Sequence, residues 1–175
     1  MKQHKYLILF LAVIFLTLNS CSTTDDTDEL AFTDSLNAAS YASPVLLRIN
    51  SEAFNTVNTN RLNSINTGDT FIINNAKRTE DDILEVSISY SGGCKQHGFE
   101  VIWDGIVYTD PPCNMNLLII HNANDDNCEA LITETISINL KNLIGDNDYK
   151  DSCAYNIFTS YNSTNTADVV VEGSN

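Results

Sequence analysis

Two cysteine–histidine pairs are the residues whose types and spacing could do chemistry. In the segment SGGCKQHG, Cys94 lies three residues before His97, and His121 lies seven residues before Cys128. Thiolate and imidazole are preferred ligands of Zn²⁺, so these four residues are a candidate Cys₂His₂ metal site. The first pair has finger-like spacing, but the second is outside the usual pattern. A Cys–His nucleophile is a weaker hypothesis, because no oxyanion-hole motif or base-orienting residue can be named.

These residues lie in the connections of a predicted β domain. Apolar and polar residues alternate in three segments, Asp82–Tyr90, Phe99–Trp103 and Leu131–Leu140. A buried strand is expected at Met115–Ile120, and shorter strands at Val45–Ile49, Thr70–Ile73, Tyr155–Thr159 and Asp168–Val171. No segment shows a convincing helical period with caps, and Asn55–Thr70 is expected to be a long loop. The pattern predicts an all-β, antiparallel immunoglobulin-like β-sandwich of about eight strands, stabilised by disulfides.

The cysteines beyond Cys21 favour disulfides over a metal site. Cys94, Cys113, Cys128 and Cys153 are an even set in a loop-rich domain, which indicates two bridges with three possible connectivities. If strands 83–90 and 115–121 run up while 97–103 and 131–140 run down, Cys94 meets Cys128 at one end and Cys113 meets Cys153 at the other. SGGCKQH would then be a pinned hairpin turn, with Gly92 and Gly93 supplying positive φ.

A competing signal leaves the connectivity open. Trp103-Asp-Gly-Ile106 is a strong cue for a two-residue hairpin, which would bring Cys113 back beside Cys94. Cys128 and Cys153 would then lie at opposite ends without partners. We prefer the first arrangement because it leaves no thiol unpaired.

The N-terminus has the layout of a signal peptide. Lys2 and Lys5 form a positive n-region, and residues 6–18 (YLILFLAVIFLTL) are an unbroken apolar run. This run is too short to span a bilayer, which takes about 20 residues, but it fits an h-region. It ends in Leu-Asn-Ser-Cys21, which resembles a bacterial lipobox with the lipid-modified cysteine as first mature residue. An ordinary secretory signal or an N-terminal membrane anchor is the alternative.

The lipobox resemblance implies that Cys21 carries a diacylglycerol thioether and an acylated, palmitate-type amine. At about 0.8 kcal/mol per buried CH₂, several acyl chains hold a protein stably on a membrane, where one would not. The acidic run from Asp25 to Glu29 resembles the export signal of cell-surface lipoproteins in Bacteroidota-type bacteria, and also fits a solvated tether. We therefore expect lipid anchoring at the outer membrane, with display on the cell surface or the periplasmic face.

Charge and length limit the partners and the number of domains. Removing residues 1–20 leaves 7 basic and 23 acidic residues, a formal charge of −16. An acidic chain without a Lys/Arg cluster is not expected to bind nucleic acid. The expected organisation is a signal peptide (1–20), a lipidated acidic tether (21–43) and one β-sandwich domain (44–175).

Two oxygen-rich tracts and one aromatic residue could each bind a ligand or could have a purely structural role. Calcium could be bound by Asn122, Asn124 and Asp126, or by Asp146, Asp148 and Asp151. Both tracts lack the central Gly and closing Glu of an EF-hand loop, so turns are the simpler interpretation. Trp103 alternates with Val101 and Phe99 and is expected in the core rather than on a ligand-binding face.

The segment from Asp82 to Leu140, with its SGGC turn and its DNCEA stretch at 126–130, resembles small uncharacterised lipoproteins of Bacteroidota-type bacteria. The resemblance implies a location and a general build, and brings no catalytic residue or cofactor. The leading hypothesis is a non-enzymatic binding or accessory module of the envelope, whose partner is an envelope protein or a glycan. The alternatives are a metal-binding lipoprotein using Cys94, His97, His121 and Cys128, and a small hydrolase.

Overall fold

The computed structural model describes residues 43–79, 82–146, 148–162 and 164–173. The predicted signal peptide, Cys21 and all of the tether before Ser43 lie outside the described residues. Among the described residues, the helices are too short and too polar to cross a membrane.

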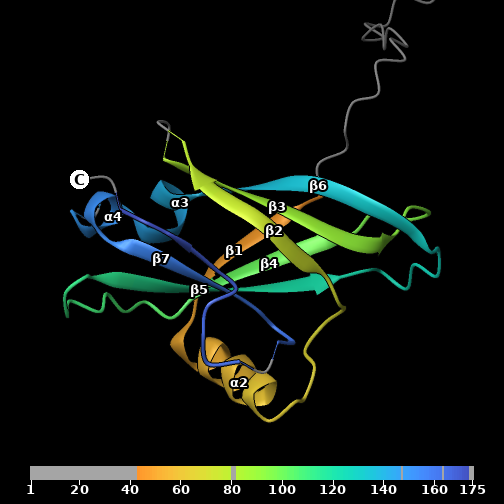
Figure 1. The fold of residues 1–175 in the computed structure, drawn as a ribbon, viewed down its shortest axis with the longest axis horizontal. Coiled ribbons are helices and arrows are strands. Elements are labelled where there is room, and N and C mark those ends of the chain that lie inside the picture. The colour runs from red at the N-terminus through yellow and green to blue at the C-terminus, as the bar shows by residue number, and fades with distance from the viewer. Residues whose placement is uncertain (1–42, 80–81, 147, 163, 174–175) are drawn as a thin grey trace, which may run out of the picture. The chain divides into compact units, whose positions relative to one another are not determined.

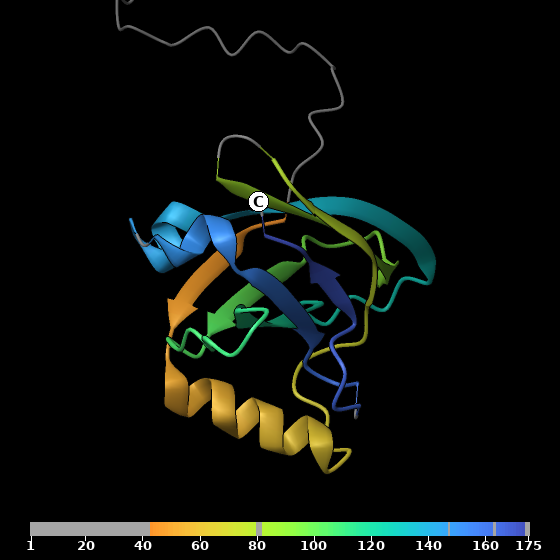
Figure 2. The ribbon, with the colours of Figure 1, turned by 60° about the vertical axis from the view of Figure 1, so that its left-hand side comes forward.

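In the described part of the chain, eight strands form two sheets that face each other, with a helix outside the larger sheet (Figures 1 and 2). The larger sheet has the order β1 (Val45–Ile49), β4 (Gly98–Trp103), β5 (Asn114–Asn122), β7 (Ala154–Thr159), β8 (Val169–Val171). The smaller sheet has the order β2 (Ile72–Arg78), β3 (Ile83–Gly92), β6 (Ala130–Asn139). The helices are α2 (Ser51–Leu62), α3 (Leu140–Ile144) and α4 (Tyr149–Ser152). The prediction of a disulfide-stabilised β-sandwich of about eight strands is confirmed.

The pairing in the larger sheet departs from the wholly antiparallel arrangement that we predicted. The smaller sheet is antiparallel throughout, but β1 pairs with β4, and β5 with β7, in parallel. Parallel neighbours need a long crossover. Between β5 and β7 the chain crosses to the other sheet as β6 and returns through α3 and α4. This return brings the start of β7 beside the start of β5.

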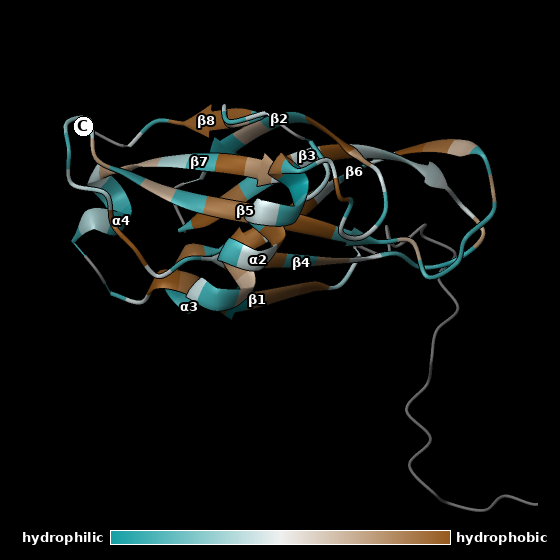
Figure 3. Ribbon diagram, turned by 90° about the horizontal axis from the view of Figure 1, so that it is seen from below, coloured by the Kyte–Doolittle hydropathy of each residue, from teal (hydrophilic) through white to brown (hydrophobic). Residues whose placement is uncertain are grey.

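The core lies between the sheets and is built from the alternating residues of the facing strands. Leu84, Val86 and Ile88 of β3 are fully buried against residues of the larger sheet such as Val101 and Leu117. Each such side chain contributes roughly 1.5–3 kcal/mol of burial free energy. Figure 3 shows the matching apolar colouring in the central strands β4 and β5. Trp103 is 6% exposed and belongs to this core, as predicted.

The prediction of a loop over 55–70 is wrong for its first half, which is helix α2. Asn50 caps the helix, its side chain accepting a hydrogen bond from the Ala53 amide at 2.9 Å. Figure 2 shows α2 lying along the outer side of the larger sheet. There Phe54 and Val57 form a small cluster of their own with Ile102 of β4 and its neighbour Leu118 of β5. Because so few apolar residues form this contact, the sequence carries no clear helical period.

The C-terminal end of α2 is fastened by a buried cation. Arg61 is 2% exposed and lies over the Phe158 ring, 4.6 Å from its centroid. Its guanidinium donates hydrogen bonds to the carbonyl oxygens of Asn162 and Thr164 at 2.9 and 2.6 Å. A cation–π contact and two charge-assisted hydrogen bonds therefore replace the apolar contacts that this polar helix lacks.

Candidate functional site

Two disulfides close opposite ends of strand β5. Cys94 is bonded to Cys128 and Cys113 to Cys153, with Cα atoms 5.9 and 4.9 Å apart. These are the two pairs that the preferred strand arrangement gives. The second pair follows from the parallel register, since Asn114 lies opposite Ala154 and the two cysteines precede these residues.

The competing hairpin at Trp103–Ile106 is not formed. The Asp104 carboxylate accepts hydrogen bonds from the Ile106 amide at 2.9 Å and from the Tyr108 hydroxyl at 3.0 Å. The chain then continues as an irregular loop to a bridge between Tyr108 and Asn114. Burial raises the pKa of Asp104. This loop keeps Cys113 at the start of β5, away from Cys94.

The connection that carries Cys94 is not a hairpin turn, because β3 and β4 belong to different sheets. Gly93 has a φ of +111°, as expected of a glycine in a tight connection. Gly92 has a different role, because a Cβ atom on it would lie 2.5 Å from Nε2 of His97. The expected positive φ is therefore wrong for Gly92, and the glycine is needed for space.

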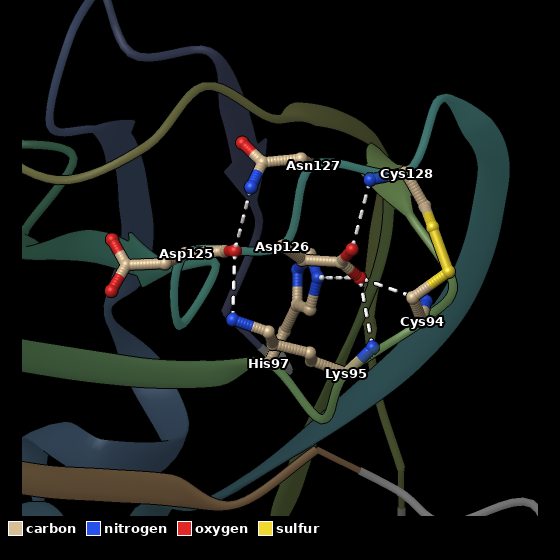
Figure 4. Close-up of a disulfide and its surroundings, with 7 residues drawn as sticks. All are labelled: Cys94, Lys95, His97, Asp125, Asp126, Asn127 and Cys128. Carbon is tan, nitrogen blue, oxygen red and sulfur yellow. Dashed lines mark hydrogen bonds and ion pairs between the residues drawn. A yellow bond between two sulfur atoms is a disulfide. The ribbon is translucent and has the colours of Figure 1, made fainter.

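A buried carboxylate is at the centre of this connection (Figure 4). Asp126 accepts hydrogen bonds from the backbone amides of Cys94, Lys95 and Cys128, each at 2.9 Å, and lies 3.1 Å from Nε2 of His97. Its side chain is 1% exposed. The Cys128 amide, followed by the other donors, holds the pKa of this carboxyl well below its usual range. Asp126 thus ties together the two loops that the disulfide joins.

Behind this carboxylate, His97 and His121 bond directly to each other. Nδ1 of His97 lies 2.8 Å from Nε2 of His121, and Nδ1 of His121 lies 3.2 Å from the carbonyl oxygen of Thr70. The rings are buried, His97 stacking on Tyr90 at 4.4 Å and His121 on Phe99 at 4.8 Å. Burial, reinforced by the neighbouring His97, lowers the pKa of His121.

A second, half-buried acid lies next to this pair. Glu134, the one interruption of the apolar face of β6, accepts hydrogen bonds from the hydroxyls of Ser43 and Tyr90, both at 2.7 Å. Burial, followed by the hydrogen bond to Glu134, raises the pKa of Tyr90 to about 12. The carboxylate thereby joins β3 to the start of β1 across the sandwich.

The Cys₂His₂ metal hypothesis is wrong for this structure. Both thiols that it needs, Cys94 and Cys128, are consumed in one disulfide. The two imidazoles point at each other at hydrogen-bonding distance, which leaves no place for an ion between His97 and His121. The structure brings the four residues together, as the metal hypothesis required, but as a covalent and hydrogen-bonded clamp.

The first oxygen-rich tract does not converge on a cation position. Asp126 is turned inward, towards His97, and the side-chain oxygen of Asn122 accepts from the Asn124 amide at 2.8 Å. Its geometry is that of a turn.

The second tract is directed at cationic side chains. Asp146 pairs with Lys141 at 3.3 Å, and Asp151 pairs with Arg78 and Lys150. Two of its three acids thus neutralise basic residues.

A cleft of about 640 Å³ lies on the outer face of the larger sheet. Its lining includes a proline just before β1, apolar side chains of β1 and β5, a loop glycine and two acids: Pro44, Leu46, Ile120, Gly68, Asp69 and Glu100. Leu46 is 56% exposed. A smaller hollow of about 330 Å³, running on towards α2, shares Glu100 and Ile120. The two hollows adjoin at these two residues, and we call them together the sheet groove.

One wall of the sheet groove is the loop that precedes β2. The Asp69 amide donates to the carbonyl oxygen of His121 at 2.8 Å, and the Asp69 carboxylate accepts from the Ala123 amide at 2.7 Å. Gly68 has a φ of +76°, and a Cβ on it would lie 2.4 Å from the same carbonyl oxygen. The wall is thus attached to the end of β5, directly outside the histidine pair.

No family model matches the chain, and no curated protein matches it. The solved structures that resemble it include a NigD-like immunity protein from Bacteroides caccae (15% identity, TM-score 0.43), a putative toxin-related protein from Parabacteroides distasonis (24%, 0.43) and a DUF1344 protein of unknown function from Bacteroides vulgatus (13%, 0.42). The matches cover 67, 70 and 67% of this chain, in the same order. They cover 52, 62 and 51% of the other proteins' chains, so this chain spans about half to three fifths of their length. Similarity at this level assigns neither family nor function.

Sequence reasoning missed the role of Asp126 and the burial of the histidine pair, although two signals were present. His97 shares the inward parity of Phe99 and Val101, and His121 that of Leu117 and Ile119. Residues at this spacing point to the same side of a strand. Asp126 lies two residues before Cys128, the spacing at which a carboxylate accepts from a backbone amide.

Proposed function

We propose that this protein is an envelope lipoprotein, anchored through an acylated Cys21, whose β-sandwich is a non-enzymatic binding module. The observation that carries the location is that all four cysteines of the described domain form disulfides. Such bonds persist outside the reducing cytosol. This supports the secretory interpretation of the N-terminus, of which the lipobox is the finer form.

A binding role is favoured over catalysis by how the acid and base groups are used. Asp126, His97 and His121 are buried and bound to one another or to backbone groups. A general acid or base must reach a substrate proton within hydrogen-bonding distance. In this cluster the acceptors and donors already have partners within the protein.

The sheet groove is the proposed binding surface, and its partner is an apolar segment of a cationic envelope protein. The floor supplies exposed apolar area at Leu46, and the acids are Asp69 and Glu100, with Arg48 paired to Glu100 at 2.9 Å. Residues 43–175 contain 7 basic and 18 acidic residues, a formal charge of −11, which attracts a basic partner. A glycan is less favoured, because the aromatic residue in the lining, Phe99, is 3% exposed and offers no stacking platform.

The anchor is tested by Cys21→Ser in a cell-fractionation experiment. The variant is expected in the soluble fraction with both disulfides intact, whereas the matched Ser22→Ala variant stays with the membrane. A Cys21→Ser protein that still sediments with membranes would contradict acylation at this residue.

The groove is tested by site-specific photo-crosslinking in cells. A photoreactive residue at Leu46 is expected to give a discrete adduct with a basic envelope protein. The control is the same residue at Leu131, which is 76% exposed on the outer face of the other sheet. Equal labelling from the two positions, or an adduct from Leu131 alone, would overturn the assignment of the surface.

A further inference from the structure

Asp126, His97, His121 and Thr70 form a row of hydrogen bonds, which we call the polar chain. We infer that the two imidazoles in it together carry one proton more than two neutral rings, and that this proton fastens the wall of the sheet groove. The three contacts measure 3.1, 2.8 and 3.2 Å, and the side-chain atoms in them are buried. The inference concerns the protein alone and goes beyond the proposed binding role.

The proton follows from counting donors and acceptors. The Thr70 carbonyl can only accept, so Nδ1 of His121 must carry a hydrogen. Nε2 of a neutral His121 then accepts, and Nδ1 of His97 must donate to it. At its other end His97 faces the Asp126 carboxylate, which already accepts from three backbone amides and is ionised. His97 must therefore donate from both nitrogens, which makes it an imidazolium.

The surroundings of the pair favour a single positive charge. Asp126 supplies the ionised partner, and Tyr90 stacks its ring on His97 while its hydroxyl is turned away to Glu134. Asp69 lies on the side of His121, where its charge acts on that ring. The nearby Lys95 ammonium is directed outward, to the carbonyl oxygens of residues 124 and 125.

Removing one proton from the histidine pair, or adding one to it, breaks the row of hydrogen bonds. If the pair loses its proton, two hydrogens must serve three contacts, and the bond to the charged Asp126 is retained because it is the strongest. His121 then turns its lone pair to Thr70, and that contact is lost. If the pair gains a second proton, both imidazoles become donors and the bond between them cannot form. The intact chain thus exists in one protonation state.

The contact that fails on deprotonation belongs to the groove wall. Thr70 follows Gly68 and Asp69, which line the groove, and Asp69 is itself bonded to the His121 backbone. Loss of the Thr70 contact therefore loosens the attachment of this wall to β5. The wall is most firmly held when the pair carries one proton.

The proton count is tested by ¹⁵N NMR of histidine side chains in the full chain. His4→Gln removes the third histidine, so that every remaining signal comes from the pair. At neutral pH we expect one ring with both nitrogens protonated and one ring with a lone pair on Nε2. Two neutral rings, or two charged rings, would overturn the inference.

The fastening is tested by amide hydrogen exchange, corrected for intrinsic rates, in His121→Phe and its parent. The substitution keeps an aromatic ring against Phe99 but removes the donor to the Thr70 carbonyl oxygen. Exchange of the Asp69 and Ala123 amides is expected to rise about tenfold, the equivalent of one hydrogen bond. The Ala154 amide, bonded to Cys113 at the far end, should not change. Unchanged exchange at Asp69 would overturn the link to the groove.

Discussion

The two ends of the sandwich carry the same covalent device in different surroundings. Sequence separations of 34 and 40 residues give the two disulfides nearly equal loop entropy. Cys153 is fully buried and part of the core, whereas Cys94 is exposed beside the carboxylate of Asp126. One bridge therefore also fills the core, and the other holds two loops around a buried polar chain.

The acidic groups near the two disulfides also differ in how far they are exposed to water. Near Cys153, Arg78 and Lys150 pair with Asp82 and Asp151, and Asp151 is 58% exposed. Near Cys94 the acid is 1% exposed. The side chains of Arg78 and Lys150 are 14% and 9% exposed, but their acidic partners are open to water, which screens these ion pairs. A buried acceptor that loses its donor is more costly. The polar network is thus expected to matter at the Cys94 end and the apolar packing at the Cys153 end.

The largest expected effect is the loss of a disulfide. Replacing either pair by alanines should lower the free energy of unfolding by about 4 kcal/mol from loop entropy. The Cys113/Cys153 variant should lose ~1 kcal/mol more, because it also leaves a cavity in the core. Urea unfolding of both double variants measures the difference. An equal or greater loss at Cys94/Cys128 would show that the polar chain depends on its bridge more than the core does.

The next largest effect is expected from breaking the polar chain while the Cys94–Cys128 disulfide stays intact. His97→Phe leaves the Asp126 carboxylate and Nε2 of His121 short of a donor and should cost about 1–3 kcal/mol. The exposed neighbour Gln96 provides the control, since Gln96→Ala should unfold like the parent. A His97→Phe protein as stable as this control would remove the distinction between the two ends.

Acid should act first at the Cys94 end. The pKa of His121 is lowered from 6.5, so the unfolded chain takes up this proton first, and stability is lost as pH falls below 6.5. The lowered pKa of Asp126 adds a second loss below its ordinary 3.8, again because the unfolded state is protonated first. Unfolding midpoints across this range should show both steps, and His121→Phe should remove the first. A first step that survives this substitution would place the acid sensitivity elsewhere.

The smallest effect is expected from the ion pairs near Cys153. Arg78→Gln should cost about 1 kcal/mol, since Arg78 also donates to the Lys150 carbonyl oxygen at 2.8 Å, and 1 M salt should remove the ionic part of this loss. Lys77→Gln, which breaks an exposed pair with Glu85, is the matched control for a surface charge. A salt-resistant loss as large as that of His97→Phe would show that the two ends use buried charge alike.

The strand segments were predictable because their signal is local. All eight expected segments coincide with or overlap a strand, since alternation with period two reflects one buried face. For β2 the expected 70–73 overlaps the observed Ile72–Arg78 at two residues only, because a register shift near Asn75 hides the alternation. The cysteine pairs were also accessible, because strand direction alone decides which loops share an end.

Tertiary structure decided what depends on partners distant in the chain. Helix α2 forms because the outer face of β4 and β5 offers Ile102 and Leu118 to two apolar side chains, too few to mark a helix in the sequence. The parallel pairing of β5 with β7 depends on the return of the chain through α3 and α4. The histidine pair needs both sheets and two loops in place before its hydrogen bonds exist. The sequence alone therefore determined which residues face inward, and only the packed sheets determined which buried polar groups meet.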